Sequence, residues 1–187
     1  MAALDGKKVA ILADNGVEEA ELLLPRRRLR EAGATVEVIA PQPGRIRLRK
    51  QADWGDAVAV NWAVDEAVVD DYDALVLPGV EAPGAAGDGD GRRHSESTVQ
   101  FVRDFYRTGR PLAAIAEGEC LLVEADVVNG KTTAAQPGLK SELEKAGAQW
   151  VDEEVVDDHG LITSRAPGDL DAFVRTLIEE LSGQRRP

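Results

Sequence analysis

The fold class is decided by one short stretch, AAIAEGECLL at residues 113–122. The apolar run from Leu112 to Ala116 stops at Glu117-Gly118, and an apolar segment suited to a helix, Cys120 to Val128, follows at once. This order predicts a buried strand, a sharp turn and the beginning of a helix. In open α/β sheets, ligands bind at the carboxyl ends of such strands, where helix N-termini present free N–H groups. The stretch therefore predicts a fold class and the place of a pocket.

The rest of the chain alternates strand patterns with helix patterns. Strands are predicted at residues 7–13, 35–40, 72–79, 131–135, 150–157 and 161–164, and helices at 18–32, 97–108, 138–146 and 170–181. Residues 44–64 indicate a small hairpin or irregular excursion, and residues 80–93 a loop. Alternating strands and helices predict a doubly wound, flavodoxin-like α/β fold with a parallel sheet between helices. The length of 187 residues predicts one domain over residues 1–187.

Composition and charge argue against several classes of protein. A formal net charge of −12 disfavours nucleic acid and anionic membranes as partners. No apolar run approaches the roughly 20 residues of a transmembrane helix, and the N-terminus lacks a signal-peptide pattern. The single cysteine favours a reducing cytoplasm. We expect no metal and no cofactor, because neither zinc-ligand spacing nor a phosphate-binding loop is found.

A collinear series of motifs runs from about residue 7 to about residue 182. Its members are GVEEAEL at 16–22, DYDALVLPG at 71–79, AIxxG at 114–118, LLVEADVV at 121–128, AGAQWVDEEVV at 146–156 and ITSRxPxDL at 162–170. The series resembles the ThiJ/PfpI superfamily, and most of all its PfpI-type branch of intracellular proteases or amidases. The resemblance implies a class I glutamine-amidotransferase-like fold and a homo-oligomer, either a dimer or a hexamer.

The same resemblance implies that the family's catalytic residues are replaced in this chain. The family elbow carries a nucleophilic Cys followed by His, and these positions are Ala116 and Glu117 here. The acidic third member, supplied by a neighbouring subunit, falls at Gly84, and the second glycine of the turn after the third strand is Val80. The family carboxylate that hydrogen-bonds the elbow thiol matches Glu21. Covalent thiolate catalysis needs a sulfur, which Ala116 lacks.

Glu21 and Glu117 are the leading catalytic candidates, because the resemblance places both in one cleft. Two close carboxylates do not both ionise freely, so one is expected to stay protonated near neutrality. Such a pair suits acid–base chemistry beside a carbonyl, such as enolisation, hydration, dehydration or isomerisation. The alternative is that Glu117 caps the helix and Glu21 hydrogen-bonds the backbone as inherited scaffold.

Other residues are candidates for binding or for packing. The expected substrate-binding residues are Gly79, Val80, Glu81, His94 and Gly118. A surface role is favoured over catalysis for His94. Cys120 lies one helical turn after Ala116, but Glu117 and Glu119 would oppose a thiolate, so packing is favoured. Trp54 and Trp62 are expected to line either the cleft or a subunit contact.

Three functions stay open on the sequence. The first is a repurposed enzyme without a cofactor, of lyase, isomerase or hydratase type, which acts on a small carbonyl-type molecule through Glu21 and Glu117. The second is a catalytically inactive family member that binds a small molecule or takes part in an assembly. The third is the family's Cys-dependent protease, deglycase or glyoxalase activity, carried by Cys120.

Overall fold

The computed structural model describes residues 2–80 and 94–183. Its centre is a seven-stranded sheet with the order β11-β12-β8-β7-β1-β3-β6. The strands of this sheet are β1 (Lys8–Leu12), β3 (Thr35–Ala40), β6 (Trp62–Ala63), β7 (Ala74–Leu77), β8 (Leu112–Ile115), β11 (Val155–Asp158) and β12 (Leu161–Ser164). Neighbours run parallel except β11 and β12, which form an antiparallel hairpin. The predicted doubly wound α/β sheet is confirmed.

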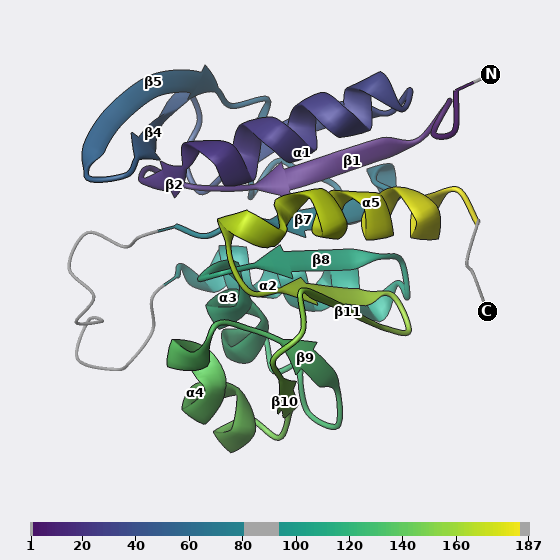
Figure 1. The fold of residues 1–187 in the computed structure, drawn as a ribbon. Coiled ribbons are helices and arrows are strands. Elements are labelled where there is room, and N and C mark those ends of the chain that lie inside the picture. Colours follow the sequence, from purple (N-terminus) through teal and green to yellow (C-terminus); the bar gives the residue numbers. More distant parts are fainter. Residues whose placement is uncertain (1, 81–93, 184–187) are drawn as a thin grey trace.

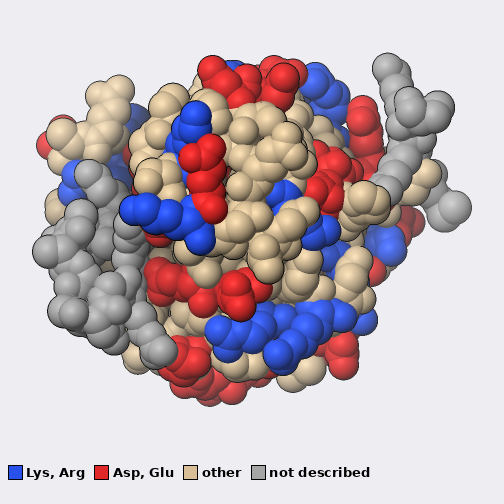
Figure 2. Space-filling model, turned by 90° about the horizontal axis from the view of Figure 1, so that it is seen from below, with Lys and Arg blue, Asp and Glu red and all other residues tan. Residues whose placement is uncertain are grey.

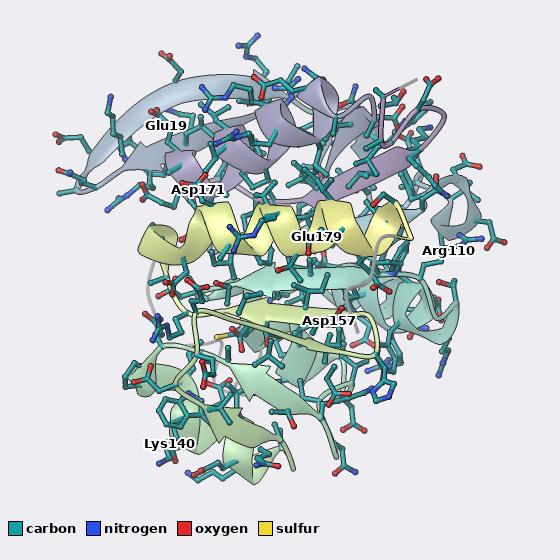
Figure 3. The ribbon with its side chains drawn as sticks, turned by 45° about the vertical axis from the view of Figure 1, so that its right-hand side comes forward. Glu19, Arg110, Lys140, Asp157, Asp171 and Glu179 are labelled. Atoms are coloured by element: carbon teal, nitrogen blue, oxygen red, sulfur yellow. The ribbon has the colours of Figure 1, made fainter. Side chains whose placement is uncertain are left out.

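Helices cover both faces of this sheet (Figure 1). On one face lie α1 (Glu19–Glu31) and α5 (Leu170–Leu181), and on the other lie α2 (Glu96–Arg107) and α3 (Gly118–Glu124). Asp171 of α5 lies against α1, where its carboxylate pairs with Arg28 at 3.1 Å (Figure 3). Each helix buries an apolar stripe, so the sheet separates two hydrophobic cores.

Two smaller sheets flank the central one. β2 (Val17–Glu18), β4 (Arg45–Lys50) and β5 (Asp53–Ala59) form the first, and the antiparallel pairing of β4 with β5 confirms the predicted hairpin. β9 (Thr132–Ala134) and β10 (Gln149–Val151) form the second, beside α4 (Lys140–Lys145). Short 3-10 turns are η1 (Val69–Asp71), η2 (Pro137–Leu139) and η3 (Pro167–Asp169).

The structure corrects two predicted elements. The strand expected over residues 150–157 is two strands, because the exposed acidic residues 152–154 separate β10 from β11, and each of these pairs with a different sheet. The helix expected to reach Val128 ends at Glu124, since Asp126 has a φ of 57°, which a right-handed helix does not allow. The loop expected over residues 80–93 lies outside the described residues, apart from Val80.

The two tryptophans whose roles were open lie on β5 and on β6. The guanidinium groups of Arg47 and Arg49 lie 5.0 and 5.3 Å from the ring centroid of Trp54. Trp62 donates a hydrogen bond to Glu37 at 3.0 Å on the edge of the main sheet. Both residues are 46% exposed. Trp54 and Trp62 therefore belong to the hairpin surface and the sheet edge.

The molecular surface mixes charges of both signs. Figure 2 shows acidic and basic side chains in small neighbouring groups over one face. Within the described ranges, none of the helices combines the length and the apolar character needed to cross a bilayer.

Candidate functional site

The turn after β8 is a sharp elbow. Ala116 follows β8 with a φ of 52°, a left-handed conformation that is costly for a residue with a Cβ. Gly118 then begins α3, and a Cβ on it would lie 2.1 Å from the Leu77 carbonyl oxygen. Only glycine lets the elbow pack this closely against β7. The predicted strand, turn and helix are confirmed.

Two carboxylates converge on Gly79, at the end of the neighbouring strand β7. Glu21, in the first turn of α1, is 2% exposed, and its Oε2 accepts the Gly79 N–H at 2.6 Å. Glu117 is exposed, and its Oε1 accepts Gln136 Nε2 at 2.8 Å. A Cβ on Gly79 would lie 2.7 Å from Glu21 Oε2 and 2.9 Å from Glu117 Oε2. The two acids thus reach the same glycine, although no hydrogen bond joins them directly in the described part of the chain.

The buried position of Glu21 changes its acidity. Burial raises the pKa of Glu21 to about 8, an effect that the Gly79 N–H opposes and the negative charge of Glu117 reinforces. Glu21 is therefore mostly protonated at neutral pH. The alternative of an inherited scaffold therefore fits Glu21 but not Glu117. Glu21 accepts a backbone hydrogen bond, whereas the Glu117 side chain makes no capping hydrogen bond at the start of α3.

A small cavity of about 20 Å³ lies beside the elbow. Its polar lining residues are Asp14, His94, Thr98 and Glu117, and the rest of its wall is Leu12, Ala13, Pro41, Pro78, Val80, Gly118 and Leu121. This space accommodates one water-sized group. Of the predicted site residues, Val80, His94, Glu117 and Gly118 line the cavity, whereas Glu21 and Gly79 lie next to it without lining it. Glu81 is outside the described residues.

Sequence reasoning missed four polar residues of this region. Asp14 lines the cavity and lies just after β1. Its position could have been predicted, because ligands in such sheets bind at the carboxyl ends of the strands. Glu124 and Gln136 contact His94 and Glu117 through tertiary structure alone. Glu119 is fully buried, its carboxylate oxygens have no hydrogen-bond partner among the described residues, and burial raises its pKa well above the usual range.

The structure places Cys120 inside the protein. Cys120 is 3% exposed and belongs to the core between α3 and the sheet. In residues 2–80 and 94–183, His, Cys, Asp and Glu side chains do not gather in any group of three that is able to hold a metal ion.

Comparison with known proteins decides the family. The model of the DJ-1/PfpI family matches residues 7–180. The chain belongs to the DJ-1/PfpI family. Among DJ-1/PfpI relatives, a deglycase of Thermococcus kodakarensis is 36% identical over 93% of this chain and 99% of the relative. The protein/nucleic acid deglycase 2 of Escherichia coli is also 36% identical, over 94% of this chain and 98% of the relative.

Solved DJ-1/PfpI structures share the fold. A two-domain protein of Anabaena variabilis with DJ-1/ThiJ/PfpI-like and ferritin-like domains superposes with a TM-score of 0.84 at 32% identity. That match covers 97% of this chain but only 50% of the two-domain protein. DJ-1beta of Drosophila melanogaster superposes with a TM-score of 0.79 at 27% identity, over 95% of this chain and 91% of its own. The resemblance to the ThiJ/PfpI group is confirmed.

Proposed function

We propose that this DJ-1/PfpI protein carries out acid–base chemistry on a small carbonyl-type molecule, without a cofactor and without a covalent intermediate. The supporting observation is the convergence of Glu21 and Glu117 on Gly79, at the carboxyl ends of two central strands. Glu117 lines the cavity and is the group that meets the substrate. Glu21, buried and protonated, is the neutral acid behind the turn.

The reaction class is proton transfer next to a carbonyl. Glu117 accepts the proton of the neighbouring carbon, and the electron pair of the broken C–H bond becomes the double bond of an enolate. Ala116 at the elbow has no side-chain nucleophile, which supports a non-covalent route.

The charges around the cavity favour an uncharged or cationic substrate. Asp14 and Glu117 both line it, and the described lining residues include no lysine or arginine. A carboxylate or phosphate group would therefore meet like charge, with no cationic partner among the described lining residues. Small uncharged aldehydes and ketones suit the charges of these described lining residues best.

Deuterium exchange tests the proposal directly. Wild-type protein is incubated with dihydroxyacetone in D₂O, and loss of the carbon-bound proton signal is followed by NMR. We expect Glu117→Gln to lower the exchange rate on the order of 100-fold, the usual effect of losing an acid–base group. The matched control is Glu153→Gln, an exposed glutamate in the segment between β10 and β11. An exchange rate with wild type equal to that of the buffer would overturn the proposal.

A second candidate function is binding without catalysis. It is favoured by the hydrogen bond from Gln136, which already occupies the Glu117 carboxylate. On this alternative, small carbonyl compounds raise the melting temperature, and Glu117→Gln changes that shift but no reaction rate.

We also propose that the protein acts as a homo-oligomer in the cytoplasm. The exposed side of α1 borders a hollow of about 790 Å³ in which Leu23 is 38% exposed. Glutamates and arginines share its lining, so a two-fold contact over this face lets acidic side chains of one copy pair with basic side chains of the other. Sedimentation velocity tests this: Leu23→Glu is expected to shift the protein toward the monomer, whereas a monomeric wild type would refute the proposal.

The cytoplasmic location is proposed from the single cysteine, which favours a reducing compartment.

A further inference from the structure

His94 is held in the cavity wall by a carboxylate that lies 30 residues away in the sequence. The Nδ1 atom of His94 lies 2.8 Å from Oε1 of Glu124, the last residue of α3. The backbone N–H of His94 donates to the other oxygen of the same carboxylate at 3.3 Å. Two contacts to one carboxylate fix both the backbone and the ring of His94.

This clamp determines which nitrogen of the ring is basic. A carboxylate accepts hydrogen bonds, so Nδ1 carries the hydrogen, and in the neutral ring the lone pair lies on Nε2. Within residues 2–80 and 94–183, Nε2 makes no hydrogen bond. His94 lines the cavity together with Glu117 and Asp14. The neutral ring therefore has a proton acceptor, on a residue that lines the same cavity as the proposed base Glu117.

We propose that His94 is a second catalytic residue, that Glu124 is its positioning residue, and that the substrate class is the α-hydroxy carbonyl compounds. The inference rests on the proposed function and names its substrate. Glu117 takes the proton from the carbon that bears the hydroxyl group, and the C–H electron pair forms the carbon–carbon double bond. His94 Nε2 accepts the hydroxyl proton and passes it to the oxygen of the former carbonyl. The ring begins and ends neutral, Glu117 ends protonated, and the negative charge left by the C–H proton ends on the oxygen of the former hydroxyl group.

This proton transfer requires a hydroxyl group next to the carbonyl. A ketone without it has no proton to give to Nε2, so the negative charge of its enolate stays on the former carbonyl oxygen. In an α-hydroxy ketone the same proton transfer moves that charge to the oxygen of the former hydroxyl group. Dihydroxyacetone carries the hydroxyl group and acetone lacks it, and both are uncharged. The two compounds therefore differ in the feature that His94 is proposed to use.

Deuterium exchange with both ketones separates the roles. We expect wild type to exchange dihydroxyacetone much faster than acetone, after each rate is divided by its rate in buffer. His94→Gln is expected to lower the dihydroxyacetone rate on the order of 100-fold and to leave the acetone rate almost unchanged. Glu117→Gln is expected to lower both rates. His159→Gln is the matched control, because the His159 side chain is 88% exposed and does not line the cavity.

The position of Glu124 is tested by the tautomer of His94. The chain has only two histidines, so ¹⁵N-histidine labelling gives two ring systems, and His159→Gln assigns them. We expect the Nδ1–H tautomer for neutral His94 in wild type and in Glu124→Gln, whose amide oxygen still accepts the hydrogen bond. Glu124→Leu is expected to shift His94 toward the Nε2–H tautomer and to lower the dihydroxyacetone rate at least tenfold.

Each outcome has a distinct meaning. No exchange with wild type overturns the proposed function and, with it, the role of His94. Exchange that depends on Glu117 but not on His94 overturns this inference alone. An Nε2–H tautomer of His94 in wild type overturns the role of Glu124.

Discussion

Glu21 Oε2 accepts the backbone N–H of Gly79 at 2.6 Å and fills the space that a side chain at position 79 would need. Gly79→Ala would place a Cβ 2.7 Å from this oxygen and 2.9 Å from Glu117 Oε2. We expect a loss of about 1–3 kcal/mol in unfolding free energy, measured by urea denaturation, because Glu21 is buried and cannot move away freely. Gly138→Ala is the control, since a Cβ there has no neighbour within 4 Å. Equal stabilities for the two variants would contradict this account.

Stability is expected to fall as the pH rises from about 4.5 to about 8. The folded-state pKa of Glu21 is about 8 against an unfolded value of 4.5, so the folded protein binds more protons within this window. The stability that Glu21 contributes is thus present in acid and lost as pH rises through its folded pKa. Burial raises the pKa of Glu119 and acts in the same direction. Urea denaturation across the window is expected to show a flatter profile for Glu21→Gln and for Glu119→Gln. A wild-type profile without slope would disprove the assignment.

Ala116 has a left-handed backbone conformation, which glycine adopts without strain. Ala116→Gly relieves backbone strain of roughly 1 kcal/mol and loses a similar amount through the greater freedom of the unfolded chain. We expect almost no net change in unfolding free energy. Ala114→Gly in the middle of β8 has no strain to relieve and is expected to lose about 1 kcal/mol or more. Equal losses at both positions would argue against strain at the elbow.

The Tyr72 hydroxyl hydrogen-bonds the carboxylate of Glu37, a residue of β3 next to the edge strand β6. Burial alone would raise the pKa of Glu37, but hydrogen bonds from Tyr72 and Lys8 outweigh it and lower that pKa. Tyr72 is 2% exposed and donates to Glu37 at 2.7 Å. Tyr72→Phe is expected to cost about 1–3 kcal/mol of unfolding free energy, because a charged acceptor loses a buried donor. Tyr106→Phe, on the partly buried side of α2, is expected to change stability much less. A comparable loss in both would remove the special role of Tyr72.

Cys120 is expected to resist thiol reagents in the native protein. The side chain is 3% exposed in the core, so reaction with a disulfide reagent has to wait for local unfolding. The reagent should modify the thiol rapidly in denaturant and slowly without it. Cys120→Ala is expected to keep any exchange activity. Rapid native labelling together with loss of activity in Cys120→Ala would restore the cysteine-dependent alternative.

The sequence by itself determined the order of the main strands and helices, but not the short strands β2 and β6. Strands β1, β3, β7 and β8 could be predicted because each is an apolar run that is visible within its own segment. Gly118, directly after such a run, predicted the elbow. The pattern failed at residues 150–157, where one β-rich run serves two different sheets, because pairing partners are not encoded locally.

Only the tertiary structure decided how the site is built. Glu21 reaches Gly79 across 58 residues, and Glu124 reaches His94 across 30. Which acid is buried and which is exposed also depends on packing: Glu21 and Glu119 are enclosed, whereas Glu117 faces solvent. These differences decide the protonation of Glu21 and the tautomer of His94, because desolvation and hydrogen-bond partners are properties of the folded chain.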